Sequence, residues 1–230
     1  MLNAQLREGR VKAGLTQVQA AARLNVSQPY LSQLEKGERP VTTALARSAA
    51  ALYRLSPTVL PKPETVSGAK PADPARLARQ LGSLGYPGFS HLHSRSRVNP
   101  ATVVVEALLQ NDLEVRLSEA LPWVLLEYST LDWPWLVRNA KEQDVQNRLG
   151  FLVATALFVA ANKNAPVDTH ERLSTVLQQL ERARLVREDT LCQEAMPAAE
   201  RRWLRENRPA LARHWNLLTS LSTDQLSYAA

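Results

Sequence analysis

The side chains with the most suggestive chemistry are the amides and hydroxyls of residues 27–33, which have the sequence SQPYLSQ. A glutamine amide can donate one hydrogen bond and accept another in the same plane, so it matches adenine, which presents N7 and the N6 amino group side by side. Serine at the first position of such a segment can cap a helix. Polar side chains that point outward from a short helix, itself preceded by another short helix, are typical of a DNA-reading device.

Two short helices are expected to position these side chains. The first begins at Thr16 and the second at Ser27, because each hydroxyl can cap the turn that follows it. Asn25 fills the tight turn between them, where asparagine is a tolerated substitute for glycine at positive φ. The apolar residues expected to be buried are Val18, Ala21 and Leu24 in the first helix and Leu31 and Leu34 in the second.

Further residues surround these two helices at regular spacing: Leu6, Arg10, Gly14-Leu15-Thr16-Gln17, Val26-Ser27, Leu31-Ser32, Glu35-Lys36-Gly37 and Arg39-Pro40. With them, residues 1–56 resemble the Cro/cI (XRE) helix-turn-helix family, whose DNA-binding domain has the lambda-repressor fold. The sequence departs from the usual pattern at Ala20, where leucine is common, and at Asn25, where glycine is common.

The resemblance implies that the second helix of the motif enters the major groove. The residues that would face the groove are Ser27, Gln28, Pro29, Tyr30 and Gln33. Gln28 and Gln33 would read adenine, and Pro29 would offer an apolar surface to a thymine methyl group. Phosphates would be held by Gln17, Lys36 and Arg39, whereas Arg10 and Glu35 would form a structural ion pair.

Charge is divided unevenly along the 230 residues. Residues 1–62 hold nine Lys and Arg against three Asp and Glu, whereas residues 63–230 hold 19 of each. The whole net charge of +6 therefore lies in the segment with the helix-turn-helix pattern. Positive charge there would increase affinity for DNA, because it releases counterions from the phosphates.

The rest of the chain is predicted to be a proline-rich linker, residues 57–74, followed by a larger multi-helical domain, residues 75–230. The fold class is therefore all-α. The expected helical segments are 73–84, 99–111, 113–120, 122–128, 132–143, 144–162, 169–185 and 197–218, the last with a break at Pro209. Residues 85–98 are expected to form an ordered loop.

The residue types of the multi-helical domain, residues 75–230, indicate contacts with a partner rather than catalysis. It holds Trp123, Trp133, Trp135, Trp203 and Trp215; core packing explains most tryptophans, and tryptophan is also frequent in interface hot spots. The runs LDWPWLV (residues 131–137), Ala140-Lys141 and NRLGF (residues 147–151) resemble the helical C-terminal region of regulators that are paired with nucleotidyltransferase-type toxins of abortive-infection systems.

Three other groups of residues could carry chemistry. Arg208 and His214 have the loose spacing of helical HEPN-type ribonucleases, but Pro209 replaces the usual polar residue. His91 and His93 could bind a metal only with further ligands. Cys192, the single cysteine, is expected to be an inert, partly buried thiol. No catalytic residue, metal or cofactor is predicted, and the protein is not expected to be an enzyme.

These observations predict a transcriptional repressor that binds a palindromic operator in double-stranded DNA as a homodimer. We expect it to be the antitoxin or autoregulator of a toxin–antitoxin or phage-defence operon, with a nucleotidyltransferase-type toxin as partner. The alternative is a plain effector-responsive repressor with a helical ligand-binding or dimerisation domain; a ribonuclease is the less favoured reading. No apolar run is long enough to span a bilayer and no leader is apparent, so a cytoplasmic, nucleoid-associated protein is expected.

Overall fold

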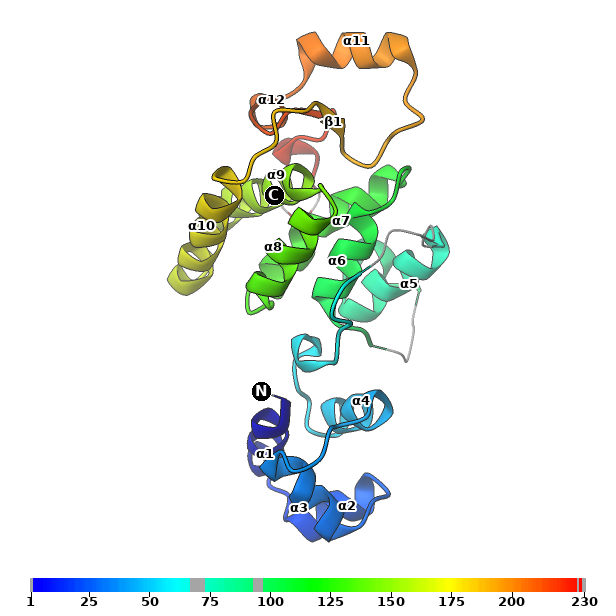
Figure 1. Cartoon of the computed structure of the whole chain (residues 1–230), viewed down its shortest axis with the longest axis vertical. Helices are drawn as coiled ribbons and strands as arrows, with labels where there is room; N and C mark the ends of the chain where they lie inside the picture. Colours follow the sequence, from blue (N-terminus) through cyan, green and yellow to red (C-terminus); the bar gives the residue numbers. More distant parts are fainter. Residues whose placement is uncertain (1, 67–72, 93–96, 227, 229–230) are drawn as a thin grey trace. The chain divides into compact units, whose positions relative to one another are not determined.

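In the computed structural model the chain forms two compact units, residues 1–63 with 95–99 and residues 64–94 with 100–230. The structure describes residues 2–66, 73–92, 97–226 and 228. Figure 1 follows the chain from the N-terminus in blue to the C-terminus in red. Twelve α-helices and two strands of two residues each are found in these described ranges, so the predicted all-α class is confirmed.

The first unit is built from four α-helices and one short 3-10 helix. They are α1 (Leu2–Lys12), α2 (Gln17–Arg23), α3 (Gln28–Lys36), α4 (Thr43–Leu52) and η1 (Pro57–Val59). Helix α3 packs against both α1 and α2. Their shared core consists of Leu6, Ala20, Ala21, Leu24, Leu31, Ala49 and Tyr53.

Local hydrogen bonds fix the ends of α2 and α3 as the sequence predicts. Thr16 accepts a hydrogen bond from the Gln19 amide, and the Gln19 side chain accepts one in return from the Thr16 amide, which completes a capping box. Ser27 caps α3 by accepting from the Tyr30 amide at 3.3 Å. Asn25 adopts a φ of 55° in the turn between the two helices. Local chemistry is therefore sufficient to delimit the motif.

One predicted core position in α2 is wrong. Val18 is 68% exposed, whereas Ala20 is fully buried. Helix α2 is short and packs closely against α3, so the face that meets α3 passes through Ala20, Ala21 and Leu24 rather than through Val18. A small side chain at position 20 is compatible with this close approach.

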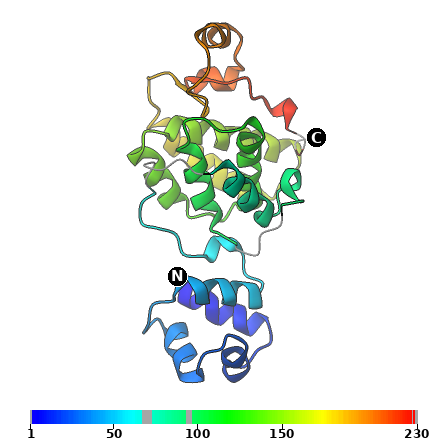
Figure 2. The same ribbon diagram turned by 90° about the vertical axis from the view of Figure 1, so that its right-hand side faces the viewer.

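The second unit contains the remaining helices. They are α5 (Pro74–Leu84), η2 (Pro87–Phe89), α6 (Pro100–Leu108), α7 (Val115–Glu127), α8 (Trp133–Glu142), α9 (Gln146–Asn162), α10 (Val167–Glu181), α11 (Ala198–Asn207), α12 (Ala210–His214) and η3 (Thr223–Gln225). Helix α9 is central: 12 of its 17 residues are buried, and it packs against α7, α8, α10 and α12. Figure 2 shows the helices of this unit from a second side.

Three predicted boundaries in this unit need correction. A single helix, α7, runs through Pro122 instead of two helices that meet there. Pro122 and its neighbours Leu121 and Leu125 are buried, so packing against α9 outweighs the hydrogen bond that proline cannot donate. Helix α10 ends at Glu181 rather than Leu185, and the segment 197–218 ends in strand β2 (Leu217–Leu218).

Strand β2 pairs in parallel with β1 (Asp189–Thr190). No sequence pattern indicated this pairing, because two residues are too few for an alternating pattern. The pair ties the α11–α12 segment to the chain that follows α10. Helix α11 contributes little to the core, since Leu204 is its single buried residue, and Figure 1 shows it at the edge of this unit.

A buried arginine on α9 joins distant parts of the second unit. Arg148 forms two hydrogen bonds to the Asp189 carboxylate, at 2.8 and 2.9 Å. It also donates to the carbonyl oxygens of Leu108 and Gln110, at 2.8 and 3.2 Å. One side chain thus holds the end of α6 and strand β1 against α9.

Two residues further along α9, Gly150 faces the ring of Trp215. A Cβ atom at residue 150 would overlap Cζ3, Cη2 and Cε3 of Trp215, the last at 2.6 Å. Trp215 is fully buried. The 147–151 segment is therefore explained by packing within this unit.

The five tryptophans all belong to the second unit. Trp133, Trp135 and Trp215 are buried, and Trp123 packs edge-on against aromatic rings of Tyr86 and Tyr128. Trp203 on α11 differs, because 57% of its surface is exposed.

The first part of the predicted linker, residues 57–66, is structured. In the first unit, Leu60 is buried against Ala46 and Ala50 of α4. In the second unit, the Val66 amide donates to Asn139 at 2.9 Å, and the indole of Trp135 donates to the Glu64 carbonyl at 3.0 Å. Residues 67–72, which include Gly68 and Pro71, lie outside the described residues.

Candidate nucleic-acid interface

Helix α3 is held so that its apolar side faces the core, whereas the side chains of its two glutamines are only partly buried. Leu31 and Leu34 are at most 1% exposed. Gln33 lies on the other side of the helix and is half-buried; in the first turn, Gln28 is half-buried and Pro29 is exposed. Because Pro29 lies in the first turn, it removes no intrahelical hydrogen bond.

A chain of four side chains runs from α1 to the start of α3. Arg10 donates to both oxygens of Glu35, at 2.6 and 3.0 Å. Gln17 donates to Glu35 at 3.0 Å, and its carbonyl oxygen accepts from Gln28 at 2.8 Å. The structure thus brings together the predicted ion pair, one predicted phosphate contact and one predicted base reader. The orientation of the Gln28 amide is fixed before any ligand is present.

The charge on Glu35 is maintained by its partners. Burial raises the pKa of the Glu35 carboxyl group, but the hydrogen bonds from Arg10 and Gln17 outweigh burial, so the pKa lies below its usual value. Glu35 is therefore an anion at neutral pH and remains an acceptor for both donors.

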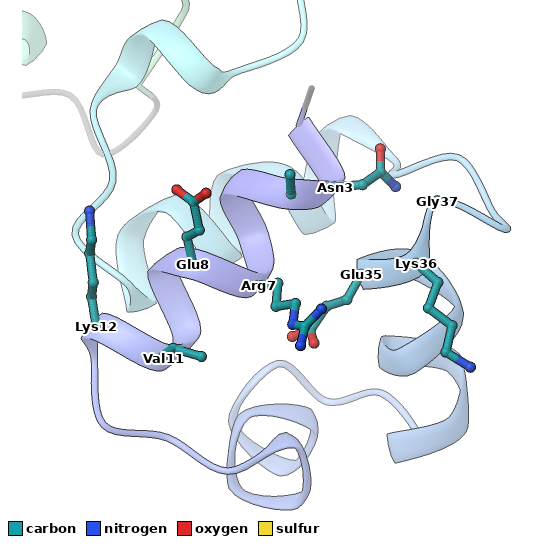
Figure 3. A pocket seen from close by; sticks show the side chains of 9 residues that line it. Asn3, Arg7, Glu8, Val11, Lys12, Glu35, Lys36 and Gly37 are labelled. Atoms are coloured by element: carbon teal, nitrogen blue, oxygen red, sulfur yellow. The ribbon is translucent and has the colours of Figure 1, made fainter.

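Arg7 is a further member of this cluster that sequence analysis did not identify. Helices α1 and α3 border a pocket of about 690 Å³, in which Arg7 lies beside Glu35 (Figure 3). The positive charge of Arg7 contributes to the lowered pKa of Glu35. Lys12 and Lys36 also line the pocket, together with Glu8.

The segment after α3 carries the other predicted phosphate contacts. Lys36 is exposed and lies 3.9 Å from the Glu38 carboxylate, which is a weak surface pair. Arg39 is exposed, with its guanidinium carbon 5.7 Å from the centre of the Tyr30 ring. Ser27 is exposed, with its hydroxyl engaged as the cap of α3.

Asn3 is a second residue that sequence analysis missed. Its side chain donates to the Leu34 carbonyl at 2.6 Å and to the Arg39 carbonyl at 3.4 Å. It therefore ties the start of α1 to the end of α3. No local pattern indicates a contact between residues so distant in the sequence.

The other chemical candidates lie in the second unit. His214 contacts Glu181, with Nε2 2.6 Å from the carboxylate, and accepts a hydrogen bond from Arg184 at its carbonyl. Arg208 instead donates to the Leu217 carbonyl at 3.0 Å. Arg208 and His214 are thus engaged by different partners.

Cys192 is fully buried, and burial raises the pKa of its thiol to about 11. His93 lies outside the described residues, as do Ser94, Arg95 and Ser96 of the predicted loop. Within the described part of the chain, no three His, Cys, Asp or Glu side chains are grouped as metal ligands. None of the helices in that part is long and apolar enough to cross a membrane.

Comparison with known proteins supports this reading of the first unit. Residues 2–62 match the family described as helix-turn-helix domain, so the resemblance predicted for residues 1–56 is confirmed. A propionyl-CoA carboxylase regulator from Cereibacter sphaeroides is 46% identical over 57 residues. That match covers 25% of this chain and 12% of the relative's length. No solved structure matches the chain.

Proposed function

We propose that the protein is a sequence-specific DNA-binding transcriptional regulator that acts as a repressor. The observation that carries the proposal is the hydrogen-bonded chain from Arg10 through Glu35 and Gln17 to Gln28. An amide already held in place loses little freedom when it binds a base edge. The positive charge of residues 1–62 and the description of a relative as a regulator support the same function.

In this proposal Gln28 and Gln33 read base edges, whereas Gln17, Lys36 and Arg39 position the domain on phosphates. Selection of binding sites from a random DNA library tests it directly. Gln28→Ala should relax the preference at one base pair. Lys36→Ala should weaken binding to all sequences alike and make its salt dependence shallower. Equal losses for Gln28→Ala on selected and random DNA would contradict its role as a base reader.

The proposal includes a homodimer on a palindromic operator. Two helix-turn-helix domains reach adjacent turns of one DNA face when the half-sites are about 34 Å apart or a multiple of it. Such a protein acts in the cytoplasm, on the nucleoid. Sites selected as inverted repeats would support the dimer, and single half-sites bound with the same affinity as repeats would contradict it.

We further propose that the repressor is the antitoxin or autoregulator of a toxin–antitoxin or phage-defence operon. The support is the resemblance of residues 131–137 and 147–151 to regulators paired with nucleotidyltransferase-type toxins. Most of these side chains are buried, so a toxin would contact other residues of the second unit. If the adjacent reading frame encodes a nucleotidyltransferase, its toxicity in cells should be relieved by co-expression of this chain; toxicity that persists would contradict the role.

An effector-responsive repressor is the second candidate, and a pocket in the second unit favours it. The pocket has a volume of about 280 Å³ and lies between α7, α9 and the start of α10, with Trp123 and Tyr228 in its wall. Apolar pockets with a few polar groups at the rim are common ligand sites. Release of operator DNA by a small molecule, abolished by Val159→Trp, would favour this candidate over the antitoxin.

The proposal includes no catalytic activity. The ribonuclease alternative requires Arg208 and His214 to act together on a phosphate, whereas each already has another partner. Incubation of the protein with RNA tests this point, with His214→Ala as the control. Cleavage that disappears in the variant would establish an enzyme and contradict the proposal.

A further inference from the structure

Tyr30 on α3 and Arg39 after α3 form a cation–π pair. The guanidinium carbon of Arg39 lies 5.7 Å from the centre of the Tyr30 ring, within the range of a cation–π contact. The backbone of Arg39 is tied to α1 as well, because Asn3 donates to its carbonyl at 3.4 Å. Arg39 is thus held at its backbone and at the end of its side chain.

The contact with Tyr30 leaves the hydrogen-bonding groups of Arg39 available. A cation–π contact involves the positive charge of the guanidinium and consumes none of its N–H donors, so these can still bind a phosphate in a bidentate manner. The nearby carboxylate of Glu38 lies closer to Lys36, and no described acidic residue forms an ion pair with Arg39. Arg39 therefore presents unpaired donors in a restricted position.

Tyr30 has no comparable polar role in the structure. Its side chain is half-buried, and its hydroxyl makes no hydrogen bond to another residue in the described part of the chain. The ring is what contacts Arg39. The contribution of Tyr30 is therefore made by its aromatic face.

We infer that Tyr30 is a positioning residue that holds the Arg39 guanidinium ready for a DNA phosphate, and that it does not read a base. The inference rests on the proposed DNA-binding function. An arginine side chain loses much rotamer freedom when it binds a phosphate, and a side chain that is ordered beforehand loses less. Tyr30 thereby increases affinity for every sequence alike.

A double-mutant cycle on a selected operator tests this inference. Tyr30→Phe keeps the ring, so the Kd should stay within about twofold of the wild-type value. Tyr30→Leu keeps the apolar bulk but removes the aromatic face, so affinity should fall about two- to fivefold, the range of an exposed cation–π contact. With Arg39→Ala already present, Tyr30→Leu should cause no further loss.

Arg23 supplies the matched control, because it is an exposed arginine of the same unit. In the double variant, the fold-losses in affinity from Tyr30→Leu and Arg23→Ala should multiply, because the two positions are not coupled. Thermal unfolding of each variant establishes that the first unit remains folded.

Three results would overturn the inference. They are a loss for Tyr30→Phe as large as that for Tyr30→Leu, an undiminished effect of Tyr30→Leu in the Arg39→Ala background, and a changed base preference for Tyr30→Leu. Each of these results would indicate that Tyr30 contacts the DNA directly. Failure of the wild-type protein to prefer any selected DNA over random DNA would instead overturn the proposed function itself.

Discussion

Replacement of Gly150 by alanine should destabilise the second unit. On an exposed helix this change would stabilise by about 1 kcal/mol, because alanine is the better helix former. At residue 150 the added Cβ would overlap the ring of Trp215, which is fully buried. Overpacking costs about 1–3 kcal/mol, and the closeness of the overlap favours the upper end. We expect a net loss of about 2 kcal/mol after the gain in helix propensity.

Tryptophan fluorescence measures this loss for the second unit alone, because all five tryptophans lie in it. A unit of this size loses about 2–4 °C in Tm per kcal/mol, so Tm should fall by about 4–8 °C. Trp215→Leu removes the obstructing ring, so Gly150→Ala should cost less in that background than in the wild-type chain. The exposed Gln178→Ala on α10 serves as the control. A Gly150→Ala variant as stable as the wild type, or equal costs in the two backgrounds, would refute this reasoning.

Three further predictions concern buried polar groups. Arg148→Ala should destabilise the second unit by about 3–5 kcal/mol, because it removes the positive partner of the Asp189 carboxylate and one donor from each of two carbonyl groups. Arg148→Lys should recover little of that loss in the fluorescence assay, since lysine lacks the planar fork that donates to both oxygens of Asp189. The pKa of Glu35 is lower in the folded protein, so its contribution to stability is present at neutral pH and lost as the pH falls through the folded pKa. Glu35→Gln should therefore reduce the acid-induced loss of hydrogen-exchange protection in α1 and α3, with protection measured relative to the intrinsic exchange rate at each pH. An unchanged pH profile of protection would contradict this. Cys192 should resist thiol reagents at neutral pH until the chain unfolds, because it is buried with a pKa raised to about 11; rapid labelling of the native protein would show otherwise.

Local chemistry made the helix-turn-helix predictable. Thr16 and Ser27 cap helices through neighbouring amides, and Asn25 adopts positive φ within a single turn. Each of these features depends on residues only a few positions apart. The position of Gln33 on the open side of α3 follows from the burial of Leu31 and Leu34 at helical spacing.

Contacts between distant residues could not be predicted in the same way. The exposure of Val18 depends on which side of α2 meets α3, and the continuity of α7 through Pro122 depends on packing against α9. Periodicity indicates that a helix has an apolar side, but the neighbouring helix decides which residues of that side are covered. The cation–π contact of Arg39 with Tyr30 and the hydrogen bond from Asn3 to Leu34 likewise could not be predicted from the sequence.

The sequence by itself determined the class of the first unit, its charge and the identity of the polar side chains on α3, because these depend on composition and on local hydrogen bonds. Only the tertiary structure decided how those side chains are held. Glu35 lies 18 residues from Gln17 and 25 from Arg10, and Arg148 lies 41 residues from Asp189. Such pairs meet only when helices pack, since hydrogen bonds act over about 3 Å of space regardless of the separation along the chain.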